Sequence, residues 1–265
     1  MERLYCFIRS WPSESLGRIP RIGLSGFASS AISKNFFCRK CLTRRGRHRM
    51  DIPACGGYPA PVFNRYRNIS LTPVKALIGL NILVFVLTEI LPARQQAVVD
   101  SFLGLSGSGL AQGMIWQFIT YQFLHAGILH LAVNMMGLWF TGNILERVLG
   151  ARNFVFLYLL CGIGGGILQV MISPGPTLIG ASGAVSGLVA AFSTLYPRMP
   201  ITALLFFVIP VRMQAMWLGI IVVGLSLFFL LTGLFNDIGN GAHIGGALAG
   251  FCWVKYRQRH FRVVR

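Results

Sequence analysis

Acidic side chains are scarce in this chain of 265 residues, which has seven Asp and Glu against 24 Lys and Arg. Charged residues of both signs make up only 12% of the sequence, whereas 54% is hydrophobic. That balance excludes an ordinary soluble globular domain and predicts a membrane protein. The net charge of +17 is also typical of nucleic-acid binding, but 11 of the 24 basic residues lie within residues 1–49 and most others lie beside apolar segments. We therefore interpret the charge as a signal of membrane topology and predict no nucleic-acid partner.

The sequence also lacks the cysteine spacing of a disulfide framework. Two of its six cysteines, Cys161 and Cys252, lie inside apolar runs, so we expect reduced thiols. One group has the ligand types of a Cys3His zinc site, namely Cys38, Cys41, His48 and Cys55. Because a basic segment of low hydrophobicity more often holds unliganded cysteines, we predict no metal and keep zinc as the alternative.

Residues 1–49 have no apolar run long enough for a secretory signal. Three interpretations compete for them: a disordered basic tail, an organelle-type transit segment, and an extension upstream of a chain that starts at Met50. We assign residues 1–69 to a poorly ordered basic region, cytoplasmic or processed. The membrane domain is expected at 70–257 and a basic cytoplasmic tail at 258–265.

What the chain does have is apolar stretches close to the roughly 20 residues that a helix needs to cross a bilayer. There are six, at 74–91, 128–147, 153–172, 182–196, 213–235 and 241–257. We predict an all-α, polytopic membrane protein with six transmembrane helices. Basic residues flank the second-to-third and fourth-to-fifth connections and fill the tail, so these parts are predicted to be cytoplasmic.

The outer side is predicted to hold the long connection at 92–127 and the outer end of the fourth segment. The long connection contains aromatic residues suited to the headgroup level, so we expect it to be partly embedded, with His125 at the water interface. The fourth segment would rise only ~22 Å against a ~30 Å hydrocarbon core. Its outer end is therefore expected below the surface, beside a cavity walled by residues 173–177.

In this topology the second, fourth and sixth segments run from outside to inside, and the polar residues within them fall near their outer ends. Polar side chains in a membrane are costly and indicate function. They are His130 and Asn134, Ser182 and Ser186, and His243. His130 and Asn134 share one helix face, and small residues let segments four and six approach closely. A serine and a histidine on such helices could lie within hydrogen-bond reach, as an activated nucleophile requires. Ser186, one turn deeper, is interpreted as a helix-contact residue.

Three short motifs carry a family resemblance that covers about residues 70–257. The residues Gly180-Ala181-Ser182-Gly183 resemble the GxSG motif of the rhomboid intramembrane serine proteases. Ala242-His243-Ile244-Gly245-Gly246 resembles their histidine motif, and His130-Leu131-Ala132-Val133-Asn134 resembles their HxxxN motif. The resemblance implies a six-helix rhomboid-like bundle, with Ser182 as nucleophile and His243 as general base. It places His130 and Asn134 at the oxyanion site, supported by Gly180 and Gly183. One departure is Trp116-Gln117, where the family often has Trp-Arg.

A carboxylate to complete a catalytic triad is missing near these residues. Glu146 lies 16 residues after His130, or ~24 Å along a helix axis. Asp237 alone is on the predicted outer face, in a loop before His243. We therefore predict a Ser-His dyad.

Our interpretation is a serine endopeptidase that cleaves membrane-anchored substrates near the outer membrane face. It needs no cofactor or metal, and its partners are transmembrane protein substrates and the lipid bilayer. A bacterial inner membrane is favoured, with an organelle membrane as the alternative. A non-catalytic rhomboid-like protein that binds or dislocates membrane proteins predicts loss of the serine or the histidine, but both are present. A small transporter would favour paired charges at mid-membrane, which the sequence does not show.

Overall fold

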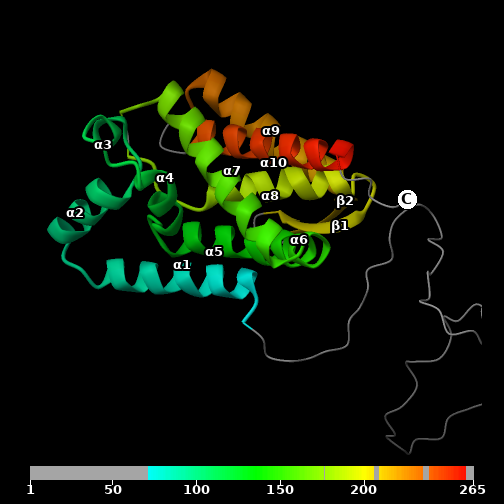
Figure 1. The fold of residues 1–265 in the computed structure, drawn as a ribbon, viewed down its shortest axis with the longest axis horizontal. Helices are drawn as coiled ribbons and strands as arrows, with labels where there is room; N and C mark the ends of the chain where they lie inside the picture. The colour runs from blue at the N-terminus through cyan, green and yellow to red at the C-terminus, as the bar shows by residue number, and fades with distance from the viewer. Residues whose placement is uncertain (1–70, 176, 206–208, 235–238, 261–265) are drawn as a thin grey trace, which may run out of the picture. The chain divides into compact units, whose positions relative to one another are not determined.

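The structure is a computed structural model that describes residues 71–175, 177–205, 209–234 and 239–260 (Figure 1). The predictions made for residues 1–69, for the possible zinc ligands and for Asp237 lie outside these ranges. Described residues form mostly helices. In chain order they are α1 (Pro73–Glu89), α2 (Ala93–Leu103), α3 (Gly107–Ala111), α4 (Gln117–Thr120), η2 (Tyr121–Phe123), α5 (Ile128–Gly137), η3 (Leu138–Gly142), α6 (Asn143–Leu149), α7 (Ala151–Ile172), α8 (Ser182–Leu195), β1 (Pro200–Leu205), β2 (Ile209–Gln214), α9 (Ala215–Thr232) and α10 (Asn240–His260).

Each of the six apolar segments predicted from the sequence coincides with helical structure. Three of these helices are long and apolar enough to cross a membrane: the continuous run from α5 through the π-helical turn η3 to α6, then α7, then α9. Helix α8 is apolar but has only 14 residues, and α1 has 17. The chain is therefore a mostly helical membrane protein with three candidate spans in its described part.

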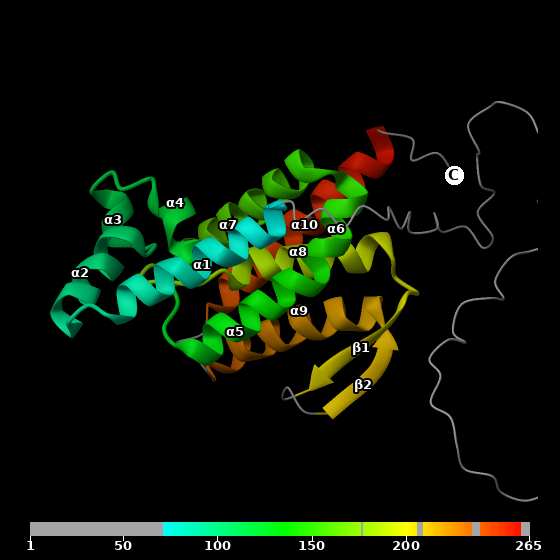
Figure 2. The same ribbon diagram turned by 90° about the horizontal axis from the view of Figure 1, so that it is seen from below.

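The all-α prediction misses one element, an antiparallel hairpin in the connection between α8 and α9. Strands β1 and β2 pair from Pro200 opposite Gln214 to Leu205 opposite Ile209. Several of these residues are β-branched, which favours a pleated strand. We call residues 93–123 the α2–α4 region, which includes η2. The hairpin and the α2–α4 region lie at opposite ends of the long helices (Figures 1 and 2). A second difference is the end of α10, which continues to His260, past the predicted segment end at 257.

Glycines bring α7, α8 and α10 into backbone contact. A Cβ atom on Gly246 of α10 would collide with the carbonyl group of Gly183 on α8, and one on Gly250 would collide with that of Gly187. A Cβ on Gly165 of α7 would lie 2.6 Å from the carbonyl oxygen of Ala242. Helices in lipid associate through such close packing of small residues. The sequence prediction that segments four and six approach closely is confirmed.

Helix α1 is fixed at its start by groups that satisfy its free N–H donors. Pro73 occupies the first helical position, where no N–H is needed, and the Thr72 side chain accepts from the Lys75 N–H at 3.4 Å. The Glu146 carboxylate on α6 accepts from the Val74 N–H at 3.1 Å. A carboxylate is stabilised at a helix N-terminus, so Glu146 joins α6 to α1 and is not part of the predicted catalytic group.

The connection at 92–127 is a folded unit held by buried side chains. Gln117 is fully buried; its Oε1 accepts from the Ser106 N–H at 3.2 Å and its Nε2 donates to the Ser101 carbonyl at 3.0 Å. Tyr121 is also fully buried, and its hydroxyl donates to the Gly162 carbonyl of α7 at 2.6 Å. Gln117 therefore anchors this connection at the position where the motif comparison found a departure.

Candidate active site

Ser182 is the first residue of α8, as the sequence predicted. The turn before it depends on Gly180, whose φ of +122° is a conformation that L side chains rarely adopt. The Gly180 N–H donates to the Tyr121 carbonyl at 2.9 Å, which ties this turn to the α2–α4 region. Backbone N–H groups in the first turn of a helix have no partner within the helix. Ser182 thus lies half-buried beside a set of free N–H donors.

His130 of α5 packs directly on the turn that precedes Ser182. A Cβ on Gly180 would lie 2.6 Å from Cε1 and 2.8 Å from Nε2 of the His130 ring, so only glycine leaves room for the imidazole. This contact brings the HxxxN residues on α5 to the GxSG residues at the start of α8. Gly180 therefore supports the site by leaving space for the His130 ring.

Asn134 lies one turn further along α5 and is 3% exposed. Its Nδ2 donates to the His130 carbonyl of its own helix at 3.0 Å. A side-chain amide nitrogen carries two N–H donors, so this bond uses one of them. The second is the group through which Asn134 can act on another atom.

His243 is the fourth residue of α10 and lies next to the start of α8. A Cβ on Gly183 would be 3.2 Å from the carbonyl oxygen of Ala242, so the residues that follow Ser182 and precede His243 are in contact. Gln169 of α7 holds this end of α10, because its Oε1 accepts from the Ala242 N–H at 3.2 Å. The Gly183–Ala242 contact therefore brings the GxSG and histidine motifs together.

The His243 ring makes a hydrogen bond that the motifs did not predict. Its Nδ1 lies 3.2 Å from the hydroxyl oxygen of Ser226 on α9. Ser226 is 4% exposed and also donates to the Val222 carbonyl at 2.9 Å. Sequence reasoning missed Ser226, although a lone serine in the middle of an apolar helix was a signal of the kind used for the other site residues.

One feature of the site differs from the simplest expectation. Within the described residues the Ser182 hydroxyl makes no hydrogen bond to either ring nitrogen of His243. Catalytic hydrogen bonds are often long in structures without substrate. Ser186 is 7% exposed between helices, consistent with its interpretation as a helix-contact residue.

The prediction that His125 lies at the water interface is wrong. His125 is 5% exposed and its ring meets that of His130 edge to face, with centroids 5.1 Å apart. Burial, together with the nearby His130, lowers the pKa of His125 to about 4. His125 is therefore neutral at neutral pH and supports the start of α5 by packing against His130.

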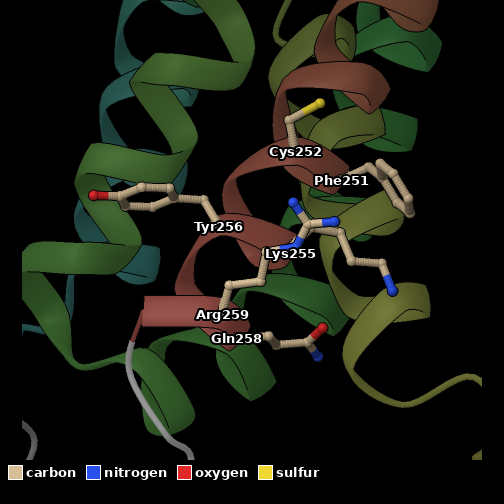
Figure 3. Close-up of a pocket in the computed structure, with 6 residues that line it drawn as sticks. All are labelled: Phe251, Cys252, Lys255, Tyr256, Gln258 and Arg259. Carbon is tan, nitrogen blue, oxygen red and sulfur yellow. The ribbon is translucent and has the colours of Figure 1, made fainter.

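A hollow in the surface lies elsewhere on the molecule, at the opposite end of α10 from His243. Figure 3 shows its six lining residues, all on α10: Phe251, Cys252, Lys255, Tyr256, Gln258 and Arg259. None belongs to a predicted motif. Among the described residues, no group of three His, Cys, Asp or Glu side chains is placed to hold a metal ion.

Comparison with known proteins finds a family domain over the part of the chain that contains all these residues. The model described as "Rhomboid domain" matches residues 112–259. "Rhomboid protease GluP" of Bacillus subtilis (strain 168) is 34% identical over 187 residues, covering 70% of this chain and 35% of the relative. "RHOMBOID-like protein 12, mitochondrial" of Arabidopsis thaliana is 31% identical over 211 residues, covering 71% and 60%.

A third relative is "Rhomboid protein 1, mitochondrial" of Saccharomyces cerevisiae (strain ATCC 204508 / S288c). It is 29% identical over 221 residues, which is 74% of this chain and 56% of the relative. The matched regions thus span between 35% and 60% of these three relatives' own lengths. Because the matched domain covers more than half of the chain and contains all three motifs, this chain belongs to the rhomboid family.

Proposed function

We propose that this protein is an intramembrane serine protease that cleaves membrane-anchored protein substrates with a Ser182–His243 dyad. The observation that carries the proposal is the junction at the start of α8. There the His130 ring packs on Gly180, and Gly183 packs on Ala242. Three motifs from separate helices thereby meet around one serine. A relative of this chain, at 34% identity, is named a rhomboid protease.

In the proposed reaction the Ser182 oxygen bonds to the carbonyl carbon of the scissile peptide, and its proton passes to Nε2 of His243. The same proton then goes to the leaving amine, which breaks the C–N bond and leaves an acyl-enzyme. Water then attacks the acyl carbon while His243 takes its proton. Transfer of that proton to the Ser182 oxygen breaks the ester C–O bond, which releases the carboxylic acid and restores the serine hydroxyl. This sequence of steps is complete without a metal or cofactor.

The negative charge that forms on the carbonyl oxygen needs donors. Free N–H groups in the first turn of α8, at the positive end of the helix, supply them. We assign a further donor to the second N–H of Asn134, with His130 beside it on the same face of α5. The Gly180 N–H already bonds to the Tyr121 carbonyl, so we assign Gly180 no direct contact with the oxyanion.

We further propose that six helices cross the bilayer: the three candidate spans together with α1, α8 and α10. Helix α8 would be sunk from the outer face, and its position between α7, α10 and α5 supports this placement, since short helices at membrane depth need protein around them. The membrane domain would occupy 70–257. The relatives that match this chain include one from a bacterium and two named as mitochondrial. Mass spectrometry of the mature N-terminus would distinguish an organelle membrane, where a leader segment is removed, from a bacterial one.

Substitution of the dyad tests the proposal. We expect Ser182→Ala and His243→Ala each to abolish cleavage of a transmembrane model substrate in liposomes, because one removes the nucleophile and the other its base. Ser186→Ala is the matched control, since it removes a buried hydroxyl one turn away, and it should retain activity. Cleavage by folded Ser182→Ala protein would disprove the proposal. A non-catalytic binding protein would instead capture the substrate equally well with or without Ser182.

A further inference from the structure

Helix α9 is almost entirely apolar, and its one mid-helix hydroxyl belongs to Ser226. Most of its side chains face outward; the two buried ones are Ala215, at its first position, and Ser226. Thr232 is exposed at the last position. The buried polar position of this helix is therefore the one that meets His243 on α10.

The hydrogen-bond partners of Ser226 bear on which nitrogen of the His243 ring carries the proton. The Ser226 hydroxyl donates its single proton to the Val222 carbonyl at 2.9 Å. Its oxygen is then an acceptor toward His243 Nδ1, 3.2 Å away. With the hydroxyl proton on the Val222 carbonyl, Nδ1 donates in this bond and carries the ring proton, and a neutral imidazole has only one. Nε2 is left with the free electron pair that a general base needs.

We propose that Ser226 is a positioning residue for the protease reaction, which holds His243 in the tautomer and orientation that present Nε2 to Ser182. The expected effect on kcat rests on the proposed protease function, whereas the effect on the His243 tautomer does not. In serine proteases of other folds a carboxylate does this work on the second ring nitrogen. In this protein the neutral Ser226 hydroxyl lies beside Nδ1 of His243, where those proteases have the carboxylate, and it donates its own proton to the Val222 carbonyl.

The size of the effect follows from the charge that His243 gains during the reaction. When Nε2 takes the Ser182 proton the ring becomes an imidazolium, and hydrogen bonds to charged groups are stronger than bonds between neutral ones. The Ser226 bond therefore stabilises the transition state more than the resting enzyme. We expect its loss to lower kcat by about tenfold with KM unchanged. This is far below the ~10⁴-fold loss when a triad carboxylate is neutralised.

The test compares Ser226→Ala, Ser226→Thr and Thr232→Ala in the full chain. Thr232 is the matched control because its hydroxyl also donates to a carbonyl four residues earlier, that of Phe228 at 2.8 Å, but it is exposed and away from His243. Turnover is divided by the number of sites labelled to completion with a fluorophosphonate. We expect Ser226→Ala to show the tenfold loss in kcat, Ser226→Thr to recover most of it, and Thr232→Ala to match the parent. Unchanged turnover in folded Ser226→Ala, or an equal loss in Thr232→Ala, overturns the proposal.

A spectroscopic measurement decides the point independently of activity. The ¹⁵N NMR signals of a histidine distinguish a protonated from an unprotonated ring nitrogen. In the inactive Ser182→Ala background, His243 should show a protonated Nδ1, and adding Ser226→Ala should produce a mixture of tautomers. An identical spectrum with and without Ser226 contradicts the positioning role. If Ser182→Ala alone retains full cleavage, the protease proposal fails, whereas the NMR result still stands or falls on the Ser226–His243 bond.

Discussion

At the scale of single residues, the candidate site depends on two glycines as well as on its polar side chains. Gly180 leaves the space that the His130 ring fills, and Gly183 leaves the space that the Ala242 carbonyl approaches. Gly180 also has a positive φ, so alanine there would meet both backbone strain and the imidazole. The three motifs pack against one another because these two positions carry no Cβ.

Asn134 is the residue whose structural and catalytic roles must be separated. One N–H of its amide already supports its own helix at the His130 carbonyl. If the other stabilises charge that exists only in the transition state, Asn134→Ala should lower kcat and kcat/KM together by roughly 10²- to 10³-fold with little change in KM.

The measurement for Asn134→Ala is turnover per fluorophosphonate-labelled molecule, with thermal unfolding recorded on the same preparation. A purely structural Asn134 predicts a lower melting temperature and fewer labelled sites but normal turnover at each one. That outcome, or a defect confined to KM, contradicts the oxyanion assignment. His130→Ala should give a similar or weaker loss, since its ring packs on the turn that precedes the nucleophile.

The motif residues can be picked out from the sequence alone, whereas the residues that surround them in the fold cannot. Short sequence motifs identify Ser182, His243, His130 and Asn134 without any knowledge of the fold. Ser226 has no such pattern, because its importance comes from the crossing of α9 and α10, which no local spacing encodes. His125 was misplaced for the same reason, since polarity in a connection predicts exposure unless a neighbouring element covers it.

At the scale of elements, length and hydropathy placed the six apolar helices to within a few residues, and the short fourth segment begins at Ser182 as expected. The short helices α2, α3 and α4 within the 92–127 connection were not predicted. The β1–β2 hairpin was not predicted. Its sequence is apolar and lies between two apolar helices, so it was absorbed into the connection and the start of the fifth segment. Strand pairing depends on a partner strand, and short apolar runs do not distinguish strand from helix by periodicity alone.

The α2–α4 region supplies a test of an element held by polar contacts. Gln117 satisfies the Ser106 N–H and the Ser101 carbonyl, both through a fully buried side chain. Gln117→Leu keeps the approximate size but leaves both groups without this partner. We expect the free energy of unfolding to fall by about 1–3 kcal/mol, because the buried Ser106 N–H is left unsatisfied and such a group costs about that much.

Denaturant or thermal unfolding of the purified full chain in one detergent measures the Gln117 effect. Gln112→Leu is the matched control, since the same change is made at an exposed glutamine five residues earlier. Equal stability of the two variants would show that Gln117 does not anchor this region. A loss of activity that exceeds the loss of folded protein would show instead that its effect extends to the Gly180 turn, which bonds to Tyr121 of the same region.

At the scale of the whole molecule, charge and architecture point to the same orientation. The α2–α4 region and the hairpin occupy opposite ends of the helices (Figures 1 and 2). The connection at 92–127 holds only Arg94 and Asp100 as charged residues, whereas Arg198 and Arg212 flank or lie in the hairpin. Because basic connections stay in the cytoplasm, the hairpin end should be cytoplasmic and the α2–α4 end should face outward.

This orientation also decides from which side a substrate and water reach Ser182. Helix α8 begins at Ser182 and ends at Leu195, three residues before Arg198, so we expect its start to face outward. Single cysteines test the arrangement: Gln112→Cys in the α2–α4 region and Met199→Cys beside the hairpin, both at exposed positions. Each keeps every basic residue, so the charge that determines topology is unchanged.

In intact cells or organelle-derived vesicles of known sidedness, a membrane-impermeant maleimide should label Gln112→Cys and leave Met199→Cys unlabelled until the membrane is opened. Peptide mass spectrometry locates the label, so the native cysteines do not interfere. Labelling in the reverse order would place Ser182 near the cytoplasmic face and require substrates to be cleaved there. Labelling of both positions from one side would contradict the proposed crossing of the bilayer by α8, because that helix connects the two ends of the molecule.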